Sequence, residues 1–426
     1  MSALERMLGE FDAQPAAAQS AARAAAAQAL RAAGLPTRHD ENWRYANLRA
    51  IEHLRTFQGA TTAASGVSLA LPEPLQGYHR LVLIDGRLSS GSTGTSRADL
   101  TRLPFEAAVT AEPPMPFATD GDGRLGLTAR LFAPEALALR LSGHAAVEII
   151  SISTPALTGC YTDFVIDIAA GAQVSLVERR LTAFDAGAAR AEATAIDGHN
   201  LRLRIESGAN LTHTRLQQTA DHVVQHDTLA VTVGEHALYR LRQVQAGGAS
   251  ARSSAQVQLA GRDAKFDWRA VAAAKGTQVA DVQFTILHDA PGTRSDQLFR
   301  GIASDRAHVA CSADVQVVAA ATGARVQQSL RGLIDGKGAE VDLRPRLTIN
   351  TNDIHATHGA TTGRLDENLL FYLLARGIDE LAARSLLKWA FLGEALGGID
   401  PPALRRAADL AAASKLSDAP ATELLL

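Results

Sequence analysis

Between residues 126 and 350 the chain consists of short extended runs, each introduced by a small turn residue, such as "GAQVSLVERRL" and "GTQVADVQFTI". Apolar residues recur at every second position within these runs, as Val174 and Leu176 do in the first of them. A period of two is typical of β-strands that bury one face. No amphipathic helix of useful length separates the runs, which disfavours βαβ units and therefore a Rossmann or TIM-barrel fold.

The glycines at these turns do not follow a fixed period. The sequence distance changes at each step along Gly171, Gly208, Gly234, Gly261 and Gly276. This irregularity argues against a strict hexapeptide repeat, but a β-solenoid tolerates turns of variable length. A β-sandwich would show the same alternation of apolar residues. Pattern alone therefore leaves a β-solenoid and a β-sandwich open.

Helical segments are expected on both sides of this β region. Residues 2–33 are rich in alanine, the residue with the highest helix propensity, and Gly34 follows as a helix stop. The C-terminal stretch has a helical pattern that breaks at Gly377 and resumes after Asp379, a favourable N-cap. We divide the chain into an N-terminal helical region (1–57), a proline-rich connector with a minor sheet and one strand that turns at Asp85–Gly86 (58–125), a β core (126–363) and a C-terminal helical region (364–426).

The composition excludes several classes of protein. A formal net charge of −3 leaves no basic excess to neutralise phosphates, so we expect no nucleic-acid binding. Two cysteines, Cys160 and Cys311, indicate neither a disulfide framework nor a thiolate-based metal site, and they are typical of a reducing compartment. Charged residues in the first turns argue against a secretory signal, and no stretch of about 18 apolar residues would span a membrane. We expect a cytoplasmic protein with no membrane segment.

Motifs of catalysis are missing or incomplete. The segment "GLIDGKGAE" (332–340) is one residue short of a P-loop, and Gly338 replaces the Ser or Thr that would hold magnesium. No GxSxG elbow is present. These observations favour a scaffold that is not an enzyme. The alternative is a β-helix polysaccharide lyase or hydrolase, against which the aromatic content of 5% counts.

Two stretches carry a resemblance to a known family. The C-terminal "RLTINTNDIHATHGATTGRLDENLLFYLLARGI" and the N-terminal "GLPTRHDENWRYANL" resemble the SufB/SufD family of iron–sulfur cluster assembly proteins. The resemblance implies a right-handed parallel β-helix, which decides between solenoid and sandwich. It also implies a scaffold subunit that pairs with a SufB-like chain, binds a SufC-like ATPase, and supports de novo cluster building and iron acquisition.

The same resemblance assigns candidate metal ligands in the segment 353–359. His358 falls on the family histidine thought to help hold the nascent cluster or its iron, shared with the partner. Ala356 stands where the family has a cysteine, so this position offers no thiolate. His355, in place of a lysine, is the second candidate, although residues three apart on a strand point to opposite faces. Gly359 and Gly363 are expected to be turn residues at positions where a bulkier side chain would crowd the backbone.

The C-terminal helices are expected to dock the ATPase partner through an apolar stripe. Aromatic and aliphatic anchors dominate such contacts. The residues expected to carry the contact are Leu381, Leu386, Trp389 and Leu392. In isolation the chain could instead form a homodimer. The family also allows a flavin, for which no residue of this sequence gives support.

Overall fold

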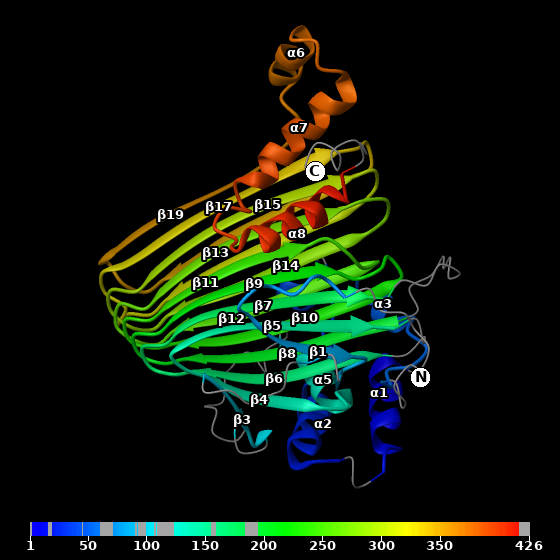
Figure 1. The fold of residues 1–426 in the computed structure, drawn as a ribbon, viewed down its shortest axis with the longest axis vertical. Coiled ribbons are helices and arrows are strands. Elements are labelled where there is room, and N and C mark those ends of the chain that lie inside the picture. The colour runs from blue at the N-terminus through cyan, green and yellow to red at the C-terminus, as the bar shows by residue number, and fades with distance from the viewer. Residues whose placement is uncertain are drawn as a thin grey trace.

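The computed structural model describes residues 2–15, 19–44, 46–59, 71–89, 92, 99–105, 108, 123–154, 159–183 and 195–416. Two parallel sheets form the centre of the molecule, and the chain alternates between them to build a β-solenoid (Figure 1). The predicted mainly β fold, a parallel β-helix between N-terminal and C-terminal helices, is confirmed. No helix in the described part of the chain is long and apolar enough to cross a membrane.

The first sheet has nine strands in the order β18-β16-β14-β12-β10-β8-β6-β4-β3. Its strands pair in parallel except for β3, which lies antiparallel to β4. Their bounds are β3 Leu100–Leu103, β4 Ala136–Leu141, β6 Cys160–Ile168, β8 Ala195–Ile205, β10 Val223–Val233, β12 Ser250–Leu259, β14 Val279–His288, β16 His308–Val317 and β18 Glu340–Ile349.

The second sheet has ten strands in the order β19-β17-β15-β13-β11-β9-β7-β5-β1-β2. β1 and β2 form the hairpin predicted at Asp85–Gly86, and both turn residues have positive φ, as a type I′ turn requires. The bounds are β1 His79–Ile84, β2 Arg87–Leu88, β5 His144–Ser153, β7 Gln173–Thr182, β9 Asn210–Gln218, β11 Leu238–Gln245, β13 Lys265–Ala274, β15 Arg294–Ser304, β17 Ala324–Asp335 and β19 Ile354–Gly363. Because β1 pairs in parallel with β5, the solenoid already begins in the segment expected to be a connector.

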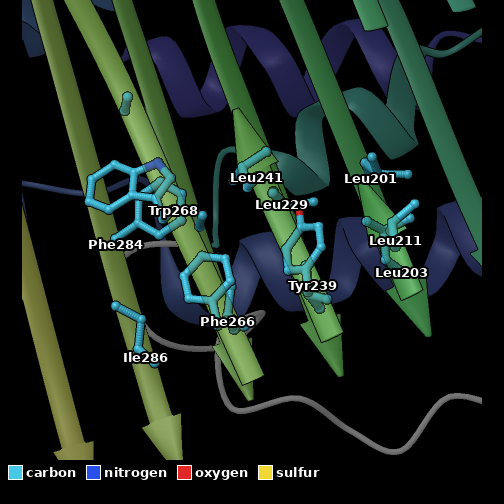
Figure 2. Packing of buried hydrophobic residues seen from close by; sticks show 14 of the residues in the cluster. Leu201, Leu203, Leu211, Leu229, Tyr239, Leu241, Phe266, Trp268, Phe284 and Ile286 are labelled. Carbon is cyan, nitrogen blue, oxygen red and sulfur yellow. The ribbon is translucent and has the colours of Figure 1, made fainter. Parts of the chain in front are cut away.

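Side chains that point into the solenoid form columns, because each strand lies in register with the corresponding strand of the next coil. Tyr239 is the register partner of Phe266, and the two rings stack at 5.3 Å. Trp268 stacks on Phe284 of the opposite sheet at 4.0 Å between ring centroids (Figure 2). Each aromatic ring therefore contributes its buried area and a stacking contact of about 0.5–1.5 kcal/mol.

The irregular glycine spacing has two causes in the turns, and the first is that Gly276 lies between β13 and β14, on the other side of the coils from Gly171 and Gly208. On the side that holds Gly171 and Gly208, seven turns each contain one residue with a left-handed backbone, which glycine adopts without strain, whereas the described turn between β18 and β19 contains none. In two successive coils His236 and Asp263 take this conformation instead, with φ of 54° and 56°. A left-handed residue therefore recurs in successive turns of this side, but glycine does not occupy all of these positions. The residues that take this conformation are Gly143, Gly171, Gly208, His236, Asp263, Gly292 and Gly323.

N-terminal helices cover the outer face of the nine-stranded sheet. They are α1 Ala3–Asp12, α2 Ala21–Ala33, the 3₁₀ segment η2 Glu41–Trp43, α3 Leu48–Glu52 and α5 Gly126–Phe132. α2 ends at Gly34 as predicted. Trp43 is buried, and the guanidinium of Arg252 on β12 lies 3.8 Å from its ring centroid and also pairs with Asp281. This cation–π contact ties the N-terminal region to the solenoid.

In the described part of the chain, three helices follow the last strand: α6 Glu367–Ala375, α7 Glu380–Gly393 and α8 Pro402–Ala413. α8 lies along the outer face of the ten-stranded sheet, whereas α6 projects beyond the last coil (Figure 1). The side chain of Asp379 caps α7 as predicted. Lys388 is buried and lies 2.5 Å from Asp335 of β17, and Glu394 lies 2.7 Å from Arg300 of β15. The second half of α7 is therefore fixed to the sheet.

The turn geometry predicts a contrast between two glycine-to-alanine substitutions. Gly171 has a φ of 69° with open space around a built Cβ atom, so Gly171→Ala suffers backbone strain alone. We expect it to lower the free energy of unfolding by about 1 kcal/mol. Gly359 lies within β19, also in open space and without positive φ, so Gly359→Ala is the matched control and should be neutral. Urea unfolding curves compare the two; equal curves would show that the turn does not require glycine.

Candidate functional site

The solenoid is open at its C-terminal end. β18 and β19 are the last strands of their sheets, and within the described part of the chain each pairs with one neighbour only. Most residues of β19 are exposed to solvent. One backbone edge of each strand therefore faces outward and is available for pairing with another chain.

The two candidate histidines lie on β19 and occupy opposite faces. His355 is the register partner of Arg325, and His358 is the register partner of Gln328. Ala356 packs against the apolar core, so its face is the inner one. Strand alternation places His358 on this inner face and His355 on the outer face. Both side chains are exposed, and the structure does not bring them together.

Two buried amides lie in the same column as His358. Gln328 on β17 and Gln297 on β15 are consecutive register partners beneath it. Within the described residues both amide atoms of Gln297 and Oε1 of Gln328 are buried without a hydrogen-bond partner. The interior below His358 therefore offers polar groups in a position where earlier coils carry Trp268 and Leu241. This polar column was not anticipated; inward-facing glutamines in the alternating pattern were its signal.

Neither cysteine of this chain is available as a ligand. Cys160 and Cys311 are both buried. Burial raises the pKa of the Cys160 thiol to about 12 and raises that of Cys311 well above its ordinary value. Since only the thiolate binds metal well, a site at the open end would need its sulfur ligands from elsewhere.

The structure corrects the expectation for the two glycines of β19. Gly359 and Gly363 lie within the strand and not in a turn, and an added Cβ atom would meet nothing within 4 Å. Within this chain neither position requires glycine. The segment 332–340, which has part of the P-loop pattern, runs from β17 through a turn into β18. It opens no helix, so it lacks the helix N-terminus that a phosphate-binding loop uses.

The predicted docking stripe on α7 is divided between buried and exposed residues. Leu381 is 55% exposed, whereas Leu386 and Trp389 are partly buried. Leu392 has no exposed surface, because it packs against Val271 and Ile302 on the outer face of the ten-stranded sheet. The expectation that Leu392 is an exposed anchor is therefore wrong. Sequence periodicity identified an apolar stripe but could not show that the sheet covers its C-terminal half.

The exposed apolar surface instead centres on α6. Phe371 is 72% exposed, and Leu369 and Tyr372 are each more than half exposed. A pocket of about 300 Å³ lies at the base of α6, where Leu369 meets Leu387 and Phe391 of α7. Large apolar side chains that gather on a projecting helix indicate a contact surface for another protein. We call Leu369, Phe371, Tyr372, Leu374 and Leu381 the α6–α7 apolar surface.

A second polar feature is buried inside the early coils. Glu178 on β7 lies 2.8 Å from Nε2 of His199 and 2.9 Å from Nε2 of His213. Arg215 lies 2.6 Å from both Glu178 and Asp227. Arg180 pairs with Asp197 at the same side of the interior. Sequence reasoning missed this network, although charged residues at the inward positions of "VERRL" and "LTHTRLQQ" were its signal.

The pKa values in this network follow from burial and pairing. Burial works to raise the pKa of Glu178, but Arg215 and the two imidazoles outweigh it and hold that pKa well below its usual range. Burial lowers the pKa of both His199 and His213 from 6.5, and Glu178 offsets this only in part. The folded state therefore favours an ionised Glu178 and neutral histidines. The residues of the network are buried, so we expect it to have a structural role.

Comparison with known proteins identifies what the chain is similar to. Residues 150–391 match the family model described as SUF system FeS cluster assembly, SufBD core domain. The matched region includes both β18 and β19, α6 and most of α7.

Curated relatives extend the similarity over most of the chain. The iron–sulfur cluster assembly protein SufD of Escherichia coli is 26% identical over 381 residues, covering 86% of each chain. A SufBD family protein of Synechocystis is 27% identical over 399 residues, covering 88% of this chain and 86% of its own. A SufBD family protein of Mycobacterium tuberculosis is 30% identical over 232 residues, covering 53% of this chain and 58% of its own. None of these descriptions names a polysaccharide-active enzyme.

The buried network predicts that two similar Glu-to-Gln substitutions lower the free energy of unfolding by different amounts. Glu178→Gln leaves Arg215 short of a buried counter-charge, and we expect a loss of about 3–5 kcal/mol in the free energy of unfolding. Glu206 pairs with Arg140 at 2.8 Å on the surface, with both side chains about 40% exposed, so Glu206→Gln should cost less than about 1 kcal/mol. Chemical unfolding at pH 7.5 measures both, and equal costs would contradict the structural role of the network.

Stability should also fall with acidification. His199 and His213 have a lowered pKa in the folded state. Their contribution to the free energy of unfolding is therefore complete above pH 6.5 and is lost as the pH falls below that value. Glu178, whose pKa is also depressed, adds a further loss below about pH 4.5. Unfolding midpoints from pH 8 to pH 5 should decrease for the wild type and decrease less for His199→Gln/His213→Gln. A flat wild-type profile would exclude this linkage.

Proposed function

Because the chain belongs to the SufB/SufD family of iron–sulfur cluster assembly proteins, we propose that it is a scaffold subunit that pairs with a SufB-like chain at the open end of its solenoid and binds a SufC-like ATPase through its C-terminal helices. The observation that carries the proposal is the exposed edge of β19 with His358 on its inner face. The subunit itself hydrolyses no ATP, since the segment 332–340 lacks the sequence and the setting of a P-loop.

The open end suits pairing with another solenoid. β18 and β19 each present one free backbone edge, and an exposed edge strand is a template for an added strand. A SufB-like chain of the same architecture would extend both sheets at once. Without that partner, a second copy of this chain could cover the same edges, which would produce a homodimer.

The α6–α7 apolar surface is the proposed contact for the ATPase. Its side chains lie on the part of the C-terminal helices that extends past the solenoid, while the rest of α7 and α8 pack on the sheet (Figure 1). An aromatic residue that is exposed in the free chain and becomes buried in a complex is the usual anchor of an interface. Phe371 and Tyr372 therefore replace Leu392 as the expected anchors.

Iron or a nascent cluster is the proposed cargo at the junction with the SufB-like chain. His358 offers one imidazole, a good ligand for iron, and the buried cysteines of this chain offer no thiolate. One imidazole is too few to hold a cluster. The cluster is therefore shared, and the partner supplies the thiolate or carboxylate ligands. His355 on the outer face plays no direct part.

The docking proposal predicts an effect at Phe371. Phe371→Asp should weaken binding of a SufC-like ATPase by at least about tenfold while the solenoid remains folded, because a hot-spot aromatic is replaced by a charge. The matched control is Leu71→Asp, since Leu71 is an exposed apolar residue outside the C-terminal helices. Pull-down and titration with the purified ATPase measure both; undiminished binding by Phe371→Asp would place the contact elsewhere.

The cargo proposal predicts different effects for the two histidines. In the complex with a SufB-like chain and an ATPase, His358→Ala should lower iron affinity by about tenfold or more, because one ligand is lost. His355→Ala, on the opposite face of the same strand, is the control and should change little. Anaerobic reconstitution with iron and sulfide, followed by absorbance and iron analysis, separates them. Equal cluster content in intact wild-type and His358→Ala complexes would reduce His358 to a structural residue.

A further inference from the structure

Three potential metal ligands converge on the outer face of the nine-stranded sheet. His308 begins β16 and Glu340 begins β18, and the two are register partners. Asp342 lies two residues further along β18 and so shares their face. Nε2 of His308 is 2.7 Å from Oδ2 of Asp342, and the ligand atoms of all three residues lie within 4.8 Å of one another.

The charge balance of this group differs from that of paired carboxylates elsewhere on the strands. Asp167 pairs with Arg204, and Asp267 pairs with Arg242, each at 2.6–2.7 Å. Within the described ranges, neither Glu340 nor Asp342 forms an ion pair with a lysine or arginine, and the imidazole of His308 contacts Asp342.

The nearest arginines on the same strand already have a partner. Arg344 and Arg346, which follow on the same face of β18, both pair with Glu41 of the N-terminal region. Among the described residues, these two carboxylates on alternate positions of an edge strand therefore have no lysine or arginine partner. A divalent cation would supply that charge.

We propose that His308, Glu340 and Asp342 form a binding site for a first-row divalent transition metal ion, such as Zn²⁺ or Fe²⁺. One imidazole nitrogen and two carboxylate oxygens suit these ions, whereas Mg²⁺ and Ca²⁺ prefer oxygen ligands alone. Bonds of about 2.0–2.2 Å place neighbouring ligand atoms roughly 3.0–3.4 Å apart, so Nε2 of His308 and Oδ2 of Asp342 must separate slightly from their present 2.7 Å. Glu340 is exposed, so its side chain is free to rotate inward, and the metal replaces the hydrogen bond between His308 and Asp342.

The position of the site leaves coordination positions open. β18 is the last strand of its sheet, so no further strand lies beyond Glu340 and Asp342 in the described structure. Three protein ligands with open positions form an accessible site and not a closed structural one. The site is separate from His358, which lies on the inner face of the other sheet. The inference stands on these contacts and does not require the proposed function.

Metal titration of the purified full chain tests the site. Calorimetry with Zn²⁺ and anaerobic visible spectroscopy with Co²⁺ at pH 7.5 should show one ion bound per chain. His308→Gln and Glu340→Gln/Asp342→Asn should each weaken that binding by at least about tenfold, since each removes first-sphere ligands.

A matched control uses the same residue types in a different arrangement. His236 lies 3.8 Å from Glu235 through Nε2 and 3.6 Å from Asp263 through Nδ1, so its carboxylates flank opposite ring nitrogens and cannot share one ion. His236→Gln should leave metal binding unchanged. Unchanged affinity and stoichiometry in the triad variants, or no ion bound by the wild type, would overturn the proposal. Unfolding curves of the metal-free variants confirm that each remains folded.

Discussion

Backbone hydrogen bonding between successive coils, in unbroken parallel register, is the constraint on which the rest of the structure depends. Once the register is fixed, every inward side chain has the side chain of the next coil as its neighbour. The stack of Tyr239 on Phe266 is one product of this rule, and the column of Gln297, Gln328 and His358 is another. Each inward side chain needs only to pack against the side chains above and below it in its column.

The interior is apolar along most of its length but contains a charged region in the early coils. Buried charge is tolerated there because Glu178 is matched by Arg215 and two neutral histidines, and Asp227 shares the same arginine. Partial pairing would be far more costly than an apolar core. Both outer faces are also used: N-terminal helices cover one sheet through contacts such as Trp43 with Arg252, and α7 and α8 cover the other. No described segment of the chain covers the end of the last coil.

Much of the fold could be predicted from local sequence, and the failures have physical causes. Period-two alternation, the turn at Asp85–Gly86 and the helix ends at Gly34 and Asp379 all depend on neighbouring residues, and the structure confirms them. The coil repeat was hidden because His236 and Asp263 adopt a backbone usually reserved for glycine.

The candidate sites were harder to predict because they depend on contacts between distant segments. Leu392 shares an apolar stripe with Leu381, and only the presence of the sheet decides which of them is covered. His308 and Glu340 become neighbours through register, which no local motif encodes. His358, in contrast, could be singled out by family resemblance, and the structure adds its inward direction.

The columns also limit how such a chain can change in length during evolution. One residue inserted within a strand would turn the following inward side chains of that strand outward, so a buried aromatic would exchange places with an exposed charge. An insertion at a turn leaves every column intact. The number of residues from one register partner to the next already varies in this chain. It is larger from Ser295 to Val326 than from Tyr239 to Phe266, although both are pairs of partners in adjacent coils. Related chains should therefore differ in length at their turns and keep the same phase within their strands, even where few residues are identical.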